Sequence, residues 1–202
     1  EETFTHDLFS ITVDHSAKTD LQKVKFVKIM LKEIQVIKYS IESGLSQCIV
    51  TSIIQDSRGF IWLGTQSGLN RFDGSRFKVY KGDLNNVNSI QDNYVFALRE
   101  NSRGNIFIGS YNSVFMEYIY DSDIFQKIEL PGCDPKAYIS DITEDSSGNV
   151  WIGTSKSGLY RLNNDRKFVT RYGTQNSAPS EIISSDNVSS LYFNESDSKL
   201  YI

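Results

Sequence analysis

Three tyrosines, two asparagines and a lysine have side chains suited to binding a hydroxylated ligand. Aromatic rings pack against the apolar faces of such a ligand, while amide and ammonium groups form hydrogen bonds with its hydroxyl groups. All six residues lie in short polar segments between apolar runs, where loops are expected. The candidate ligand-binding residues are Asn93, Tyr94, Tyr111, Asn112, Tyr138 and Lys156.

The residues that could support catalysis or bind a metal are scattered along the chain. The two histidines, His6 and His15, lie near the N-terminus, and Cys48 and Cys133 do not have the spacing of a metal site. No glycine-rich segment ends in Lys followed by Ser or Thr, the pattern that binds a nucleotide phosphate. We therefore predict no catalytic residue, no metal site and no cofactor, and we do not expect this region to be an enzyme.

The composition is that of an ordinary globular protein. Of the 202 residues, 39% are hydrophobic and 12% are aromatic, which argues against a disordered chain and favours strands. The net charge is −4, and nucleic-acid binding requires a basic face. We therefore expect no nucleic-acid partner for this region.

An internal repeat provides the elements that must position the candidate residues. Residues 50–65 align with residues 95–110 and 139–154, and their shared glycines recur at steps of 45 and 44 residues. A fourth copy begins at Val188. Repeats of this length, built from strands, are typical of β-propellers, in which each repeat forms one four-stranded blade.

Each copy is expected to form four antiparallel strands, which in the first copy span residues 50–54, 60–64, 69–72 and 77–80. The second strand is apolar on both faces and must be covered on both sides, as neighbouring blades would do. One aromatic position recurs in this strand and is expected to fill the core between blades. Its residues are Trp62, Phe107, Trp151 and Tyr201.

Other repeated residues also have predicted structural roles. Asp56 and Asp145 follow the first strand of their copies, where an aspartate side chain binds the backbone of its own turn. Arg71 and Arg161 occupy matching positions in the third strand and are expected to pair with a neighbouring blade. The glycine two residues after the aromatic position is expected to allow close approach of a neighbouring backbone.

These patterns predict an all-β fold, a β-propeller fragment of about 3.5 four-stranded blades over residues 34–202. Residues 36–39 match the outermost strand of the other copies and are expected to close the ring as the outer strand of the last blade. Because the sequence stops at Ile202 within the fourth copy, we expect a fragment of a longer chain. Residues 1–33 form an N-terminal extension that fits neither a helix nor a strand uniquely. The predicted blades are residues 49–80, 94–130, 138–172 and, truncated, 187–202.

The copies resemble the two-component regulator propeller repeat. The match is close from Gly44 to Gly74 and includes Gln-Asp-Ser-Arg-Gly-Phe-Ile-Trp-Leu-Gly-Thr at residues 55–65. The second copy departs from this pattern, because it has Tyr-Asn-Ser at residues 111–113 and lacks the turn glycine. That departure leaves the conformation of this loop open and places an aromatic ring and an amide where a ligand could contact them.

The resemblance implies the extracytoplasmic sensor of a bacterial hybrid two-component receptor, built from propellers of about seven blades. It further implies that this module detects oligosaccharides and controls a linked histidine kinase. The implied location is periplasmic, in a membrane-tethered full-length protein that forms a homodimer and supplies the remaining blades from the same chain. Two alternatives stay open, namely a propeller enzyme of the lyase or lactonase type and a protein-interaction scaffold.

Overall fold

The computed structural model describes residues 36–175 and 178–202. The chain divides into two compact units, Glu1–Lys38 and Tyr39–Ile202, and the second unit contains all of the sheets described here. The predicted N-terminal extension at residues 1–33 and both histidines lie outside the described residues. Within the described residues, no helix is both long and apolar enough to cross a membrane.

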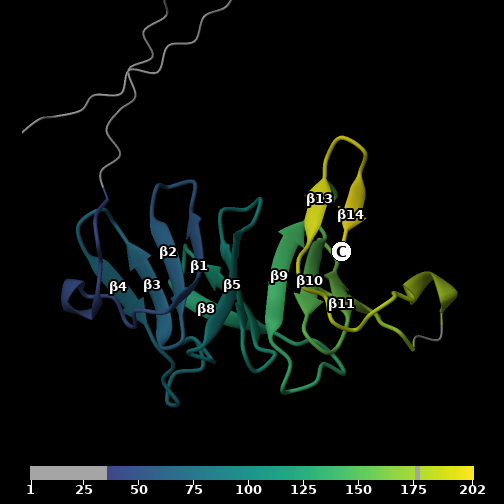
Figure 1. The fold of residues 1–202 in the computed structure, drawn as a ribbon, viewed down its shortest axis with the longest axis horizontal. Helices are drawn as coiled ribbons and strands as arrows, with labels where there is room; N and C mark the ends of the chain where they lie inside the picture. Colours follow the sequence, from purple (N-terminus) through teal and green to yellow (C-terminus); the bar gives the residue numbers. More distant parts are fainter. Residues whose placement is uncertain (1–35, 176–177) are drawn as a thin grey trace, which may run out of the picture. The chain divides into compact units, whose positions relative to one another are not determined.

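The second unit is built from four-stranded antiparallel meanders, which confirms the all-β prediction (Figure 1). Blade 1 consists of β1 (Val50–Gln55), β2 (Ile61–Thr65), β3 (Gly68–Phe72) and β4 (Phe77–Tyr80). Blade 2 consists of β5 (Val95–Glu100), β6 (Ile106–Ser110), β7 (Phe115–Ile119) and β8 (Ile124–Ile128). Blade 3 consists of β9 (Ile139–Glu144), β10 (Val150–Thr154), β11 (Leu159–Leu162) and β12 (Val169–Tyr172). A two-stranded hairpin follows, formed by β13 (Tyr192–Asn194) and β14 (Lys199–Tyr201).

Short 3-10 helices, η2 (Ile41–Ser43) and η3 (Pro179–Glu181), lie outside the blades. The segment after η2 packs on blade 1, because Leu45 is buried and the backbone N–H of Ser46 donates to Asn70 Oδ1 at 2.9 Å. Asn70 is itself buried and returns a hydrogen bond through Nδ2 to the Ser46 hydroxyl at 2.8 Å. A polar pair therefore fixes this segment on the sheet.

Hydrophobic cores lie between successive blades, as the repeat predicts. Trp62 of β2 is fully buried and stacks on Tyr80 at 5.7 Å, in a core that also receives Tyr118 from blade 2. Phe107 occupies the equivalent position in blade 2 and is fully buried in the core shared with blade 3. Trp151 is only partly buried, against the small core that contains Leu159 and Val188. Tyr201 is 50% exposed, because no described sheet covers that side of the β13–β14 hairpin.

The glycine that follows the aromatic position makes room for the next blade. A Cβ built on Gly64 would lie 2.7 Å from Val95 Cγ1 of β5, and one on Gly109 would lie 2.4 Å from Ile139 Cγ2 of β9. The close neighbour is therefore mainly a β-branched side chain at the start of the next inner strand, whereas the sequence suggested a backbone. Glycine is required here because any side chain would overlap that residue.

The two ends of the described region lack the regular blade structure. Residues 36–39, predicted as a closing outer strand, have no regular secondary structure, and Val36 is 91% exposed. The predicted partner of this strand is the last blade of a closed ring, which the sequence does not contain, so the closing strand stays a prediction. In the fourth copy the first strand begins at Tyr192, four residues after the predicted start at Val188. Val188 is instead buried at the seam with blade 3.

Candidate functional site

One face of the blades is assembled from the loops that join them and from the turns between their second and third strands. The N–H of Gly68 donates to the carbonyl of Asn93 at 2.7 Å, and the N–H of Ser113 donates to the carbonyl of Ala137 at 2.9 Å. Gly158 makes the equivalent bond to Asp186 at 2.8 Å. We call this surface the loop face. Its repeated backbone bonds fix the positions of the side chains that the loops present.

The backbone of Ser113 determines the conformation of the loop that lacks the turn glycine. Its φ angle is +58°, so its φ is positive like those of Gly68 and Gly158, which make the equivalent backbone bond to the next blade. This conformation is unfavourable for a residue with a Cβ. The Ser113 hydroxyl compensates by donating to the carbonyl of Ala137 at 3.2 Å and to that of Asp134. Blade 2 therefore keeps the backbone geometry of the other blades while presenting different side chains.

Four aromatic residues meet on the loop face at the seam between blades 2 and 3, and we call them the aromatic cluster. Tyr94 and Tyr111 stack with their ring centroids 5.1 Å apart and their planes 10° from parallel. Tyr138 also stacks with Tyr111, with their ring centroids 6.3 Å apart, and the ring of Phe96 lies 4.4 Å from that of Tyr138. Tyr111 remains 42% exposed. The cluster therefore offers ring edges and hydroxyl groups to the solvent.

The cluster forms where blade 2 departs from the repeat. Tyr111 stands where blade 1 has Gln66 and blade 3 has Ser155. Phe96 stands where the other blades have a hydroxyl residue, Thr51 or Ser140.

Those hydroxyls have a structural role that Phe96 cannot perform. Thr51 donates to the carbonyl of Val95, and Ser140 donates to the carbonyl of Val188, so that each connects its inner strand to the next blade. In blade 2 the aromatic ring of Phe96 stands in place of that hydroxyl group, so the hydrogen bond to blade 3 is missing. A loss of structural hydrogen bonding at one seam indicates a different role for the residues there.

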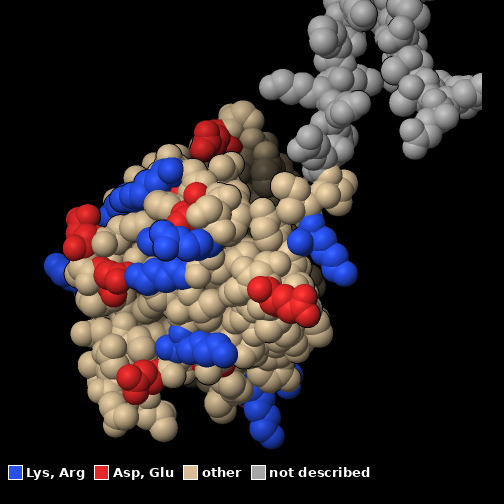
Figure 2. All heavy atoms as spheres, turned by 90° about the vertical axis from the view of Figure 1, so that its left-hand side faces the viewer, with Lys and Arg blue, Asp and Glu red and all other residues tan. Residues whose placement is uncertain are grey.

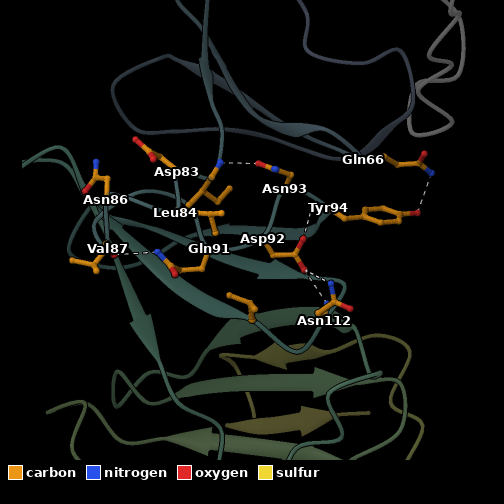
Figure 3. Close-up of a pocket in the computed structure, with 13 residues that line it drawn as sticks. Gln66, Asp83, Leu84, Asn86, Val87, Gln91, Asp92, Asn93, Tyr94 and Asn112 are labelled. Atoms are coloured by element: carbon orange, nitrogen blue, oxygen red, sulfur yellow. Dashed lines mark hydrogen bonds between the residues drawn. The ribbon is translucent and has the colours of Figure 1, made fainter.

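A pocket of about 530 Å³ lies beside the cluster, and we call it the loop pocket (Figure 3). Small-molecule sites occupy about 300–1,000 Å³. Tyr94 belongs to both the pocket and the cluster. The pocket is lined by Gln66, Gly82, Asp83, Leu84, Asn86, Val87, Ile90, Gln91, Asp92, Asn93, Tyr94, Asn112 and Val114.

Hydrogen bonds among the lining residues hold the pocket in shape. Gln66 Nε2 donates to the Tyr94 hydroxyl at 3.0 Å, which connects blade 1 to blade 2 across the pocket mouth. Asn112 donates from its backbone N–H and from Nδ2 to Asp92 Oδ2, at 3.1 and 3.0 Å. Asn93 Oδ1 accepts from the N–H of Gly82 at 2.8 Å. Each amide thus uses part of its hydrogen-bonding capacity for the fold and keeps the other part for a ligand.

The structure brings five of the six sequence-predicted residues together. Asn93, Tyr94 and Asn112 line the loop pocket, and Tyr111 and Tyr138 belong to the aromatic cluster. Lys156 is exposed and lines neither of them.

The sequence analysis missed Phe96 and Asp92. Comparing the copies position by position would have shown Phe96 as the only aromatic residue at its place in the repeat. Asp92 offered no such signal, because its importance lies in accepting hydrogen bonds from Asn112, a residue on another loop.

The repeated aspartates lie away from the loop face, in the turns between first and second strands. Asp56 Oδ1 accepts from the N–H groups of Arg58 and Phe60 at 3.0 and 2.9 Å, which confirms the predicted turn-forming role. Its Oδ2 accepts from Trp62 Nε1 at 2.7 Å and from the hydroxyl of Tyr120 in the next blade. Burial raises the pKa of Asp56, but the hydrogen bonds from Tyr120, Trp62 and the turn backbone outweigh it and hold the pKa below the usual 3.8.

The repeated arginines stack within their own blade. The Arg71 guanidinium lies 4.5 Å from the ring centre of Phe60, and that of Arg161 lies 5.7 Å from Trp151. For Arg71 the predicted pairing with a neighbouring blade is also present, because its charge helps to lower the pKa of Asp123 in blade 2. Cation–π contact with the adjacent second strand satisfies the guanidinium locally.

Charge is mixed on the side of the molecule that Figure 2 shows, where lysine and arginine side chains alternate with aspartate and glutamate. Lys78 pairs with Asp123 of blade 2 at 2.9 Å. Among the residues that the structure describes, no group of three or more His, Cys, Asp or Glu side chains is placed to hold a metal ion.

The chain matches a family model and a curated protein over short segments. The model described as the two-component regulator propeller matches residues 44–67 and 134–156. Histidine kinase P4 of Formosa agariphila is 49% identical over 47 residues, which are 23% of this chain and 3% of that protein.

Solved structures match over a larger part of the chain. The extracellular domain described as that of the hybrid two-component system BT3049 from B. thetaiotaomicron is 28% identical, with a TM-score of 0.70. The match covers 82% of this chain and 23% of that one. The corresponding domain of BT4673 from the same organism shows the same fold, with 20% identity and a TM-score of 0.65. This match covers 89% of this chain and 22% of that one. The chain thus spans less than a quarter of these proteins.

The packed meanders and these structural matches define a β-propeller fragment. Two of its segments, residues 44–67 and 134–156, match the two-component regulator propeller model, and the extracellular domain of a hybrid two-component system has a similar fold.

Proposed function

We propose that this region is the extracytoplasmic ligand-sensing propeller of a hybrid two-component receptor and that it binds an oligosaccharide on the loop face. In this proposal the full-length receptor lies in the inner membrane and is a homodimer, with the propeller in the periplasm. Ligand binding there controls a linked histidine kinase.

One observation supports the proposal above the others. The residues in which blade 2 departs from the repeat come together at the aromatic cluster, beside a pocket of ligand size. Residues needed only for folding would follow the repeat, because each blade has the same structural requirements. The amides and aromatic rings at this place are the groups that bind sugar hydroxyls and apolar sugar faces. The similarity to the extracellular domain of a hybrid two-component system supports the proposed location.

The test uses the complete protein and a panel of oligosaccharides, with the shift in melting temperature as a screen and calorimetry to measure affinity. Tyr111→Gln places in blade 2 the residue that blade 1 has at the matching position, Gln66. Phe96→Thr likewise introduces the residue of blade 1, Thr51. Because the fold already accommodates these residues in a sister blade, we expect both variants to fold.

We expect at least one oligosaccharide to raise the melting temperature of the unmodified protein, and Tyr111→Gln to weaken its binding about tenfold. Lys156→Ala is the matched control, since Lys156 lines neither the pocket nor the cluster, and it should bind normally. If no oligosaccharide shifts the melting temperature, the sensing proposal fails and an interaction scaffold becomes the better explanation. Turnover of a bound glycan would instead establish the enzyme alternative.

A further inference from the structure

We infer that the loop pocket selects uncharged oligosaccharides and rejects anionic ones, such as those built from uronic acids. This inference rests on the proposed sensing function and specifies the class of its ligand. It depends on the charges in the pocket wall and on the absence of cations to balance them.

Two carboxylates line the loop pocket, those of Asp83 and Asp92, and the residues that line it include no lysine or arginine. Asp83 Oδ1 accepts from the N–H of Asn85 at 2.9 Å, and Asp92 accepts from Tyr94 and Asn112. These donors are neutral. Within residues 36–175 and 178–202, no ion pair involves either aspartate. The pocket therefore has a net negative charge that an anionic ligand would have to approach.

Lysine would be expected in a site for acidic sugars, because an anion buried without a cation or hydrogen-bond donors is costly. Lys156 is the only cation among the sequence-predicted site residues, and it does not line the pocket. The position that would have supplied a counter-ion therefore lies elsewhere on the loop face.

The remaining lining groups suit a neutral sugar. Carboxylates accept hydrogen bonds from hydroxyl groups, and the amides of Gln66, Asn93 and Asn112 can both donate and accept. Leu84 and Val87 add fully or nearly fully exposed apolar side chains, with 105% and 82% of their reference surface accessible. The C–H faces of a pyranose ring can cover such side chains, which removes apolar surface from water.

The test compares matched oligosaccharides that differ only in oxidation at C6, such as galactose trisaccharides and the corresponding galacturonic acid trisaccharides. Glucose–glucuronate and mannose–mannuronate pairs complete the panel. Calorimetry with the complete protein at low and high salt gives the affinities. We expect the neutral member of any pair that binds to be favoured by at least about tenfold. The preference should shrink at high salt, because exposed charges are screened.

Asp83→Asn keeps the Oδ1 acceptor for Asn85 and removes one charge, so it should narrow the preference several-fold; the affinity for the neutral sugar is measured alongside. Asp165→Asn makes the same chemical change in the β11–β12 turn, outside the pocket, and should alter neither the preference for the neutral sugar nor the affinity for it. Equal or tighter binding of the uronate member would overturn this inference and leave the sensing function intact. Failure of every saccharide to bind would overturn the proposed function together with the inference.

Discussion

The contact between Gly64 and Val95 predicts a measurable coupling between neighbouring blades. A methyl group added at Gly64 would lie 2.7 Å from Val95 Cγ1 and 3.2 Å from Val95 Cβ. The first distance requires the strands to shift, and overpacking of this kind costs about 1–3 kcal/mol. The φ angle of Gly64 is not in the left-handed region, so alanine also lowers the entropy of the unfolded chain and returns about 0.4–1 kcal/mol. The expected net loss for Gly64→Ala is about 1–2 kcal/mol.

Val95→Ala removes the atom that causes the overlap. Val95 is fully buried, so this change alone should cost about 2–3 kcal/mol through lost burial and the cavity that it leaves. In the double variant the closest remaining side-chain atom is Cβ, at 3.2 Å. The new methyl group then fills part of the cavity. The two losses should therefore not add, and the double variant should be about 1–2 kcal/mol more stable than their sum.

Urea unfolding of the complete protein measures these free energies, with fluorescence of the buried Trp62 as the local signal. If the losses in the free energy of unfolding of the two single variants add to within about 0.5 kcal/mol, the steric explanation for a glycine at this position of the repeat is refuted. The same variants test the position of Tyr94, which precedes Val95 directly. Gly64→Ala should weaken ligand binding as well as stability, and Val95→Ala should partly restore binding in the double variant.

Two further predictions concern the turn and loop residues. Asp56→Asn keeps an acceptor for the turn backbone but places an N–H group against Trp62 Nε1, and should cost about 2–4 kcal/mol near neutral pH. Because the folded-state pKa of Asp56 is lowered, its ionised form stabilises the fold above about pH 3.8. In acid-unfolding experiments the stability advantage over Asp56→Asn should therefore decline as pH falls through the folded-state pKa. A difference in stability that stays constant with pH would contradict the role given to the charge of Asp56. Ser113→Ala keeps the unfavourable φ and loses the hydroxyl bonds, and should cost about 1–2 kcal/mol in thermal unfolding, whereas Ser113→Gly should be close to neutral. Equal losses in the two Ser113 variants would refute the compensation argument.

The periodicity of the sequence determined the blades, because strand formation and tight turns depend on residues close together in the chain. The predicted strands of blade 1 end within one residue of the observed ones, and the turn role of Asp56 follows from its position three residues before Gly59. The same local signals predict a closing strand at residues 36–39, but a strand forms only where another strand pairs with it, and the predicted partner belongs to a blade outside this sequence.

Comparison of the copies also showed which loop was unusual, but it could not show what that loop contacts. Only the tertiary structure brought Gln66 of blade 1 to Tyr94, and Tyr111 between Tyr94 and Tyr138. It also joined Phe96 to the aromatic cluster, and it left Lys156 outside the lining of the loop pocket. These outcomes depend on how blades pack across seams, where the contacting residues are far apart in sequence. The order of residues determined the blades of this protein, and the packing between them decided which residues form the site.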